Sequence, residues 1–175
     1  MMQTDYSKYY DLEKYLFEDI PLKFKKDGFL KASDFFCIII WKANRSKTKI
    51  KKKLLKISGS KDINEICKRL TLDIAKQTSD KDKLKILLDK WRFRLPMATA
   101  ILTVLYPNNF TIYDTRVRGQ LGMDDFADRK NQIDKYFSEY LPRVKKEGKG
   151  VTLRAKDKYF WGKSFAEDLR ELITL

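Results

Sequence analysis

The chain of 175 residues contains no histidine, two cysteines, seven glycines and four prolines. Without histidine, the sequence excludes Ser-His and Cys-His catalysis and histidine-ligated zinc. Cys37 and Cys67 form no CxxC motif, and two thiols are too few for a four-cysteine iron–sulfur cluster. Carboxylates, lysines and tyrosines therefore remain for any chemistry, and we expect neither a metal ion nor a cofactor.

Long apolar runs are also missing. The longest, residues 35–41, is too short to span a bilayer, and the first ten residues, MMQTDYSKYY, lack an apolar signal core. Both cysteines lie among apolar positions with helical spacing, which predicts buried free thiols in a reducing compartment. We therefore expect a cytoplasmic protein that does not associate with a membrane.

Positive charge, in contrast, is abundant. Thirty-eight Lys and Arg residues against 24 Asp and Glu give a formal net charge of +14, in a chain that is 43% hydrophobic. This excess attracts polyanions over a distance of roughly 8–10 Å. Nucleic acid is the first candidate partner and an anionic membrane surface the second, and a lysine-rich composition with solvated faces is the alternative interpretation.

Apolar residues recur at helical spacing through most of the chain, which predicts an all-α fold. Pro21 and Pro142 are expected to end the helices that precede them, and Gly162 to interrupt the last one. Residues 23–28 and 145–150 are expected to be basic loops. We predict one all-helical domain over residues 1–175. This domain can consist of two sub-lobes on either side of a cleft near residues 91–122. The expected helices cover residues 5–20, 31–44, 62–77, 79–91, 95–106, 114–121, 124–141, 152–161 and 164–173.

The stretch from Trp91 to Gly122 contains the best candidate for a chemical site. Asp114 follows the short segment FTIY and stands beside Tyr113, Arg116 and Arg118 at the start of an expected helix. Backbone N–H groups and positive charge at that place should keep the carboxylate ionised. From the residues alone the simpler interpretation is a helix N-cap, which stabilises a fold by about 0.5–2 kcal/mol.

Basic residues elsewhere are candidates for phosphate contacts. Arg92 and Arg94 precede the helix that begins near Pro96, whose N-terminus also favours anions. Lys42 and Arg45 lead into the densest positive run of the chain. A plain basic loop and a solvated helical face are the alternative interpretations of these two regions.

The segment LPMATAILTVLYPNNFTIYDTRVRGQLG resembles the helix-hairpin-helix DNA glycosylase superfamily. In that family an apolar helix and a loop precede an Asp-Thr-His-Val signature and a Leu-Gly pair. Residues 98–105, 114–117 and 121–122 stand at the matching positions, so the resemblance implies that Asp114 is the catalytic aspartate. The chain also resembles less characterised relatives that carry Trp-Lys-x-x-Arg, here residues 41–45, and a late Asp-x-x-x-Trp, here residues 157–161.

The chain departs from the family pattern in three places. Arg92-Phe93-Arg94-Leu95 replaces a glycine-rich hairpin, so a tight turn is not expected and the arginine side chains are the expected phosphate ligands instead. Pro96 stands where the bifunctional members carry a lysine nucleophile, so no Schiff-base or lyase step is expected. Arg116 replaces the histidine of the signature.

The resemblance implies a monofunctional DNA glycosylase of base excision repair that acts on double-stranded DNA. A damaged or modified base would be flipped out, and Asp114 would stabilise the oxocarbenium-like sugar or orient the attacking water. Trp41, Tyr113 and Trp161 are candidates for stacking on that base, although each also fits a core position. The second interpretation is a non-catalytic nucleic-acid-binding module of the same fold. The third is an adaptor that binds an acidic protein.

Overall fold

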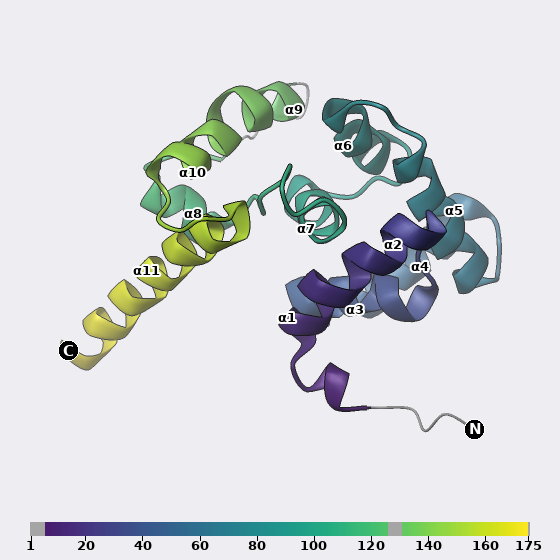
Figure 1. Cartoon of the computed structure of the whole chain (residues 1–175), viewed down its shortest axis with the longest axis horizontal. Helices are drawn as coiled ribbons and strands as arrows, with labels where there is room; N and C mark the ends of the chain where they lie inside the picture. The colour runs from purple at the N-terminus through teal and green to yellow at the C-terminus, as the bar shows by residue number, and fades with distance from the viewer. Residues whose placement is uncertain (1–5, 126–130, 175) are drawn as a thin grey trace. The chain divides into compact units, whose positions relative to one another are not determined.

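Every regular element that the computed structural model describes is helical, which confirms the predicted all-α class (Figure 1). The structure describes residues 6–125 and 131–174, and it contains no strand within those ranges. The chain divides into two compact units, residues 1–93 and residues 94–175. The division falls inside the stretch from Trp91 to Gly122.

Within residues 6–93, the first unit contains six α-helices together with 3-10 and π-helical turns. Two of its helices begin at the expected residues, where Asp62 accepts the backbone N–H groups of Asn64 and Glu65, and Ser79 accepts that of Asp82. The core of this unit is aliphatic and aromatic, as the helical spacing predicted. Its elements are η1 (Ser7–Tyr9), α1 (Leu12–Lys14), η2 (Tyr15–Asp19), α2 (Ile20–Asp27), α3 (Ala32–Ala43), η3 (Asn44–Ser46), α4 (Lys47–Ser58), α5 (Ile63–Ala75) and α6 (Asp80–Asp89).

The second unit begins with α7, the most apolar helix of the chain. Ten of its eleven residues are buried, as expected for a sequence without a polar face. Pro96 stands in its first turn, where a missing N–H costs nothing. The elements of this unit are α7 (Leu95–Leu105), α8 (Thr115–Gln120), α9 (Gln132–Lys135), η4 (Tyr136–Tyr140), α10 (Leu141–Glu147) and α11 (Leu153–Thr174).

The prediction that Pro21 and Pro142 end helices is wrong. Each proline is the second residue of a new α-helix that continues directly from a π-helical turn. The residue before each proline donates its N–H five residues back, to the carbonyl of Tyr15 or Tyr136. This wider turn accommodates a residue without an N–H at the point where an α-helix would need one. Residues 23–27 of the first expected basic loop and residues 145–147 of the second are consequently helical.

The two π-helical turns have closely similar sequences. Residues 15–21 and 136–142 both read Tyr-x-x-Glu-x-(Ile/Leu)-Pro, and both occupy the same structural position, immediately before a helix. In each, the tyrosine is buried and the residue before the proline is apolar and buried. The three residues before each tyrosine are similar as well, Leu-Glu-Lys at 12–14 and Ile-Asp-Lys at 133–135, so the similarity covers ten residues.

Two further predictions about the second unit need correction. α11 runs without interruption through Gly162, because a single glycine costs a helix only about 1 kcal/mol relative to alanine. Asp124 does not begin a helix, and the residues that follow Asp125 in the expected helix lie outside the described residues as far as Lys130. Several apolar residues of the expected last helix are exposed, including Phe165, Leu169 and Ile173.

The prediction of buried thiols is confirmed for Cys67 and is wrong for Cys37. Cys67 is fully buried, and burial raises the pKa of its thiol to about 12. Cys37 is partly exposed, and both cysteines are free. Across residues 6–125 and 131–174, no helix combines the length and the apolar character needed to cross a membrane.

Candidate nucleic-acid-binding surface and the Asp114 turn

The most basic surface of the first unit lies on α4 and the turn before it. Leu54 is fully buried, and the residues that recur three or four positions apart on the opposite face are all basic and exposed. We call this set the α4 basic surface, and it consists of Arg45, Lys49, Lys52 and Lys56. Within the described residues these four side chains form no ion pair, and no acidic residue occurs between Asp34 and Asp62.

The turn at Arg92 lies beside α4. The ammonium group of Lys53 donates a hydrogen bond to the carbonyl oxygen of Arg92 and lies 5.7 Å from the ring of Phe93. Trp91 and Phe93 are buried on either side of the exposed Arg92. The buried neighbours therefore fix the turn, and the arginine side chain stays in solvent.

Arg92 adopts a backbone conformation that normally favours glycine. Its φ is +54°, the only positive φ at a non-glycine residue in the described part of the chain. The turn lets the N–H of Phe93 reach the carbonyl of Leu87 at 2.9 Å. A left-handed turn thus forms without glycine, contrary to the expectation from the sequence, at a cost of roughly 1–2 kcal/mol. Strain of this kind at an exposed charged residue is typical of functional sites.

Other predicted contact residues of the first unit are less exposed. The ring of Trp41 is half-buried and packs edge-on against Phe17, with 5.5 Å between the ring centroids. Lys42 is also half-buried. Arg45 is exposed and contributes to the α4 basic surface, so the Trp-Lys-x-x-Arg motif presents mainly its arginine to solvent.

Asp114 is the N-cap of α8, which confirms the simpler interpretation of this residue. Its Oδ1 accepts the backbone N–H of Arg116 at 3.0 Å, and its own backbone is extended, with φ −120° and ψ 142°. The side chain is half-buried. A capped helix of six residues follows, ending before Leu121.

The segment that leads into Asp114 is buried and non-helical, and hydroxyl groups from other elements satisfy its backbone. The Tyr136 hydroxyl donates to the carbonyl of Thr111 at 2.7 Å and accepts its N–H at 3.0 Å. The Tyr140 hydroxyl donates to the carbonyl of Ile112 at 2.6 Å. Because buried backbone groups must be paired, these two tyrosines of η4 determine the path of the segment.

Two further hydrogen bonds complete this arrangement. Thr99 of α7 accepts the N–H of Tyr113 at 2.9 Å while donating to the carbonyl of Leu95 at 2.8 Å. The N–H of Asp114 lies 3.4 Å from the Tyr140 hydroxyl oxygen. We call the hydroxyl groups of Thr99, Tyr136 and Tyr140 the hydroxyl clamp. This role was not predicted from the sequence, although the i, i+4 spacing of the two tyrosines places them on one face of the helix.

Tyr140 also lies close to two carboxylates. Burial raises the pKa of its phenol well above the usual value, and the negative charges of Asp157 and Asp114 act in the same direction. Asp157 is 2% exposed and forms an ion pair with Arg154. The phenol therefore stays protonated as a hydrogen-bond donor, and the aspartate of the late Asp-x-x-x-Trp motif lies near the Asp114 turn.

The arginines that follow Asp114 contact protein groups. The guanidinium of Arg116 pairs with Asp168 and lies 5.4 Å from the ring of Trp161. The guanidinium of Arg118 lies 5.3 Å from the Tyr113 ring, and its Nη2 is 3.7 Å from a carboxylate oxygen of Asp125. Both charges are thus partly offset within the second unit.

The two remaining aromatic candidates of this unit differ in exposure. Tyr113 is only 3% exposed, its ring packs against Tyr140, and its hydroxyl donates to Asp125 at 3.0 Å. Trp161 is 45% exposed and stacks on Phe165, with 5.4 Å between the centroids. Of the predicted stacking residues, Trp161 therefore presents the largest open ring surface.

The structure distributes the predicted site residues over both units. Trp41, Lys42, Arg45 and Arg92 belong to residues 1–93, and the others belong to residues 94–175. Within the second unit, Asp114 lies close to Arg116, Tyr113 and Tyr140, and Arg116 connects this turn to Trp161. Arg94 is exposed at the N-terminus of α7.

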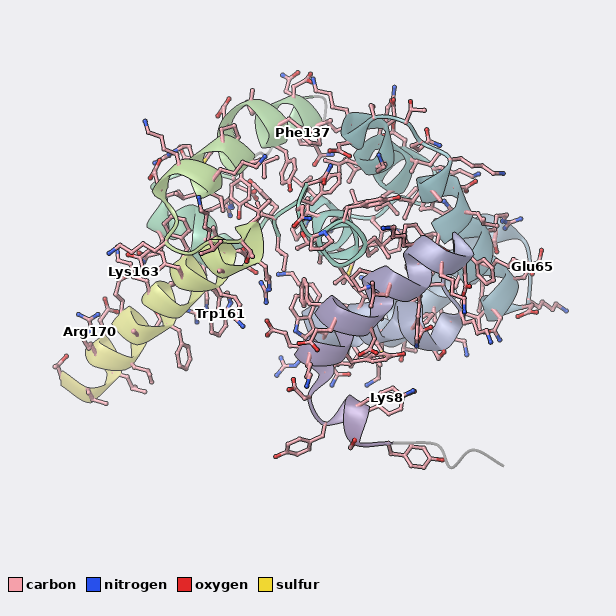
Figure 2. The ribbon with its side chains drawn as sticks, in the orientation of Figure 1. Lys8, Glu65, Phe137, Trp161, Lys163 and Arg170 are labelled. Carbon is pink, nitrogen blue, oxygen red and sulfur yellow. The ribbon has the colours of Figure 1, made fainter. Side chains whose placement is uncertain are left out.

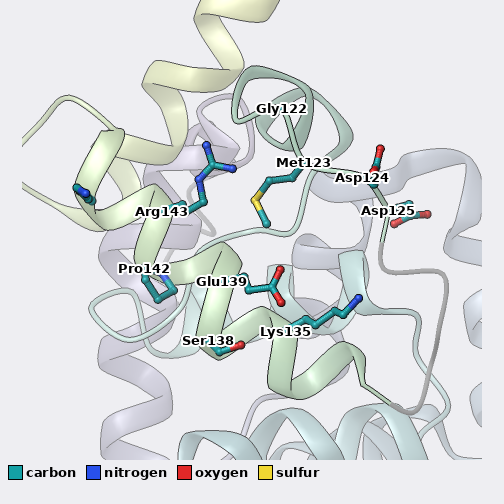
Figure 3. A pocket seen from close by; sticks show the side chains of 10 residues that line it. Gly122, Met123, Asp124, Asp125, Lys135, Ser138, Glu139, Pro142 and Arg143 are labelled. Carbon is teal, nitrogen blue, oxygen red and sulfur yellow. The ribbon is translucent and has the colours of Figure 1, made fainter.

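A pocket of about 610 Å³ in the second unit lies between the segment after α8 and the helices η4 and α10 (Figure 3). Among the residues that the structure describes, its lining carries three acidic and three basic side chains. Asp114 does not line it. Its charged lining residues are Asp124, Asp125, Lys135, Glu139, Arg143 and Lys146. In the part of the chain that the structure describes, no three potential metal ligands come together.

The chain matches no protein-family model, and no curated protein and no solved structure matches it. Its function is consequently inferred from the residues themselves, from their geometry and from the partial resemblance of residues 95–122.

Proposed function

We propose that the protein binds double-stranded DNA through the α4 basic surface and the neighbouring Arg92. The observation that carries this proposal is the row of exposed cations on α4, which form no ion pair within the described residues. They lie in a segment of 27 residues without a carboxylate, between Asp34 and Asp62. Like charges three and four residues apart on a helix repel each other, so the row does not stabilise the protein itself. A polyanion would relieve that repulsion and release counterions.

The finer part of the proposal is a monofunctional DNA glycosylase step at Asp114. Water would add to C1′ of a flipped nucleotide as the bond from C1′ to the base nitrogen breaks, and the base would leave with a proton. The Asp114 carboxylate would stabilise the positive sugar of the transition state. Two observations support this step. Residues 95–122 resemble the helix-hairpin-helix DNA glycosylases, and the helix cap and the hydroxyl clamp hold the Asp114 carboxylate in place.

A specific observation favours the second candidate, a non-catalytic DNA-binding module. One oxygen of Asp114 is already used to cap α8, which is a sufficient structural reason for an aspartate at this position. The two candidates share the α4 basic surface and differ only at Asp114.

Binding is tested by measuring affinity for a short duplex at several salt concentrations. For the triple variant Lys49→Gln, Lys52→Gln, Lys56→Gln, we expect weaker binding and a salt slope shallower by about 0.9 for each phosphate that the variant no longer neutralises. The matched control removes three exposed lysines elsewhere in the first unit, as Lys61→Gln, Lys76→Gln, Lys85→Gln. Equal effects in both variants would show a general charge effect and contradict a defined surface, and no duplex affinity at low salt would exclude both candidates.

The chemical step is tested with Asp114→Asn, because asparagine caps a helix about as well as aspartate and the fold should be preserved. Wild type and variant are incubated with duplexes carrying deaminated, alkylated or oxidised bases, and abasic sites are revealed with alkali. We expect cleavage with wild type, its loss in Asp114→Asn, and its retention in Asp124→Asn, which changes an exposed carboxylate in the same unit. If the wild type binds the duplexes tightly but produces no abasic sites, the glycosylase step is excluded and the non-catalytic module is supported.

A further inference from the structure

Another pocket lies in the first unit, and its lining residues come from η1, η2, α2 and residues 29–34. Its volume is about 270 Å³. Pockets that enclose drug-sized ligands measure about 300–1,000 Å³, so this one has room for a small ligand or for the end of a chain. None of its lining residues belongs to the α4 basic surface. A site here is therefore independent of the proposed DNA-binding surface.

Three lysines from separate elements line this pocket. Lys8 belongs to η1, Lys23 to α2, and Lys31 directly precedes α3. Figure 2 shows Lys8 on the short turn that precedes α1. The Lys8 ammonium lies 5.0 Å from the Tyr9 ring and 5.3 Å from the Tyr15 ring, and these contacts hold it at the pocket. Cations that converge on one cavity from three elements indicate an anionic ligand.

One of the three lysines is already paired with a carboxylate of the lining. The Lys23 ammonium lies 3.4 Å from Asp34 and donates to the Tyr15 hydroxyl at 2.6 Å, and this hydroxyl donates to Asp34. Burial and the bond to Asp34 raise the pKa of the Tyr15 phenol above its usual value, so the phenol adds no negative charge to the pocket. Lys23 and Asp34 therefore offset each other.

The remaining charges of the lining favour an anion. Asp27 is exposed, and within the described residues neither it nor Lys8 nor Lys31 forms an ion pair. Two lysines thus stand against one carboxylate. At this level of charge a ligand with two negative charges, such as a phosphate monoester, is bound more favourably than a neutral one.

The start of α3 adds backbone donors to the same wall. Its N-cap residue, Lys31, provides no side-chain cap, and Asn64 accepts only the N–H of Ala32, at 3.3 Å. The N–H groups of Ser33 and Asp34 donate no hydrogen bond within the described residues, and both residues line the pocket. Free N–H groups in the first turn of a helix are phosphate ligands in many proteins, here beside two lysines.

Aromatic rings complete the lining. Tyr9 is 43% exposed, and Phe29 is half-buried. An inorganic anion has no use for such rings, whereas a nucleobase stacks on them. We propose that the pocket binds the phosphate monoester of a nucleotide, with Lys8, Lys31 and the start of α3 at the phosphate and the aromatic wall beside the base. A free nucleotide and the 5′-phosphorylated end of a DNA strand both present this group.

The ligand is tested by isothermal titration calorimetry of the full chain at low salt, with dAMP, deoxyadenosine and inorganic phosphate. We expect dAMP to bind and the other two to bind at least about tenfold more weakly, because each lacks one half of the ligand. No binding of dAMP, or equal affinity for dAMP and deoxyadenosine, would overturn the proposal. Equal affinity for dAMP and inorganic phosphate would show a general anion site and would overturn the choice of a nucleotide.

The position of the site is tested with double variants of equal charge. Lys8→Gln with Lys31→Gln should weaken dAMP binding at least about tenfold, since two charge-assisted contacts are lost. The matched control, Lys25→Gln with Lys26→Gln, removes two exposed lysines of α2 outside the lining and should leave the affinity unchanged. Asp27→Asn should strengthen binding, because it removes the carboxylate that repels the phosphate. Equal losses in the two double variants would contradict this pocket as the site.

The two sources of the phosphate are separated by fluorescence anisotropy with a short single strand labelled at its 3′ end, carrying either a 5′-phosphate or a 5′-hydroxyl. Tighter binding of the phosphorylated strand, lost in Lys8→Gln with Lys31→Gln, would identify strand ends as the ligand. Equal binding of both strands, while dAMP occupies the pocket, would identify the free nucleotide. The strands share every internal phosphate, so binding through the α4 basic surface is the same for both, and failure of the proposed function would not change this comparison.

Discussion

The two non-helical connections that flank α7 differ in what holds them. Before α7, the turn at Arg92 is exposed, carries two arginines and keeps a strained residue that glycine would suit better. After α7, residues 110–113 are buried, and their backbone groups bond to the hydroxyl clamp.

The difference between the two connections indicates which substitutions the chain tolerates. In the turn at Arg92, the Lys53 ammonium and the carbonyl of Leu87 pair with the backbone, so the exposed arginine side chains are available for another role. A buried connection must find its partners within the protein, and removing a partner leaves an unpaired group. Substitutions in the hydroxyl clamp should therefore affect stability, and substitutions in the turn should affect binding.

The largest effect is expected for Tyr136→Phe. The ring is kept, but the carbonyl and the N–H of Thr111 are both left without their partner, at roughly 1–3 kcal/mol for each buried group. We expect the free energy of unfolding in urea to fall by about 3 kcal/mol. Tyr10→Phe, at a fully exposed tyrosine, is the control and should change nothing. A fall below about 0.5 kcal/mol for Tyr136→Phe would mean that water replaces the hydroxyl.

A matched pair of buried threonines gives the next effect. Thr99→Val removes the acceptor for the N–H of Tyr113 and should destabilise by about 1–2 kcal/mol. Thr111→Val removes a buried hydroxyl that has no hydrogen-bond partner within the described residues, so it should be neutral or slightly stabilising. Urea midpoints of the two variants test this contrast, and equal destabilisation would contradict the role assigned to Thr99.

For the turn, Arg92→Gly should stabilise the protein by about 1 kcal/mol, because glycine adopts a positive φ without strain. Under the proposed function the same variant should bind duplex DNA more weakly, since it removes one positive charge. Arg92→Lys is the control that retains both the charge and the strain. If Arg92→Gly lowered stability, the side chain of Arg92 would have a structural role that the geometry does not indicate.

The smallest effect is a dependence on alkaline pH. The pKa of Tyr140 is raised in the folded protein by burial and then by Asp157, so this phenol contributes stability below the unfolded tyrosine pKa of about 10 and loses it as pH rises further. At about pH 10.5 the Tyr140 phenol should lower the free energy of unfolding by at most about 1 kcal/mol relative to neutral pH, because at that pH the phenol loses its proton only in the unfolded state. Urea unfolding at about pH 9 and about pH 10.5 should therefore show a smaller loss for Tyr140→Phe than for wild type. Parallel losses would indicate that Tyr140 titrates normally.

The sequence predicted the all-α class and most of the long helices, because apolar spacing and local capping determine both. The helix starts at Asp62 and Ser79 and the N-cap at Asp114 were predicted, and each of these side chains accepts a backbone N–H of the helix that follows. These features depend on residues only a few positions apart. The predicted roles of Asp114 in catalysis and of the arginines in DNA binding stay predictions.

Only the tertiary structure decided how the prolines, Gly162 and the tyrosines are used. Pro21 and Pro142 follow π-helical turns and remain inside continuous helical segments. Tyr136 and Tyr140 reach the backbone of residues more than twenty positions away, a contact that no local pattern encodes. Local spacing determines where a helix forms, whereas the pairing of a buried backbone depends on which distant side chains folding brings to it.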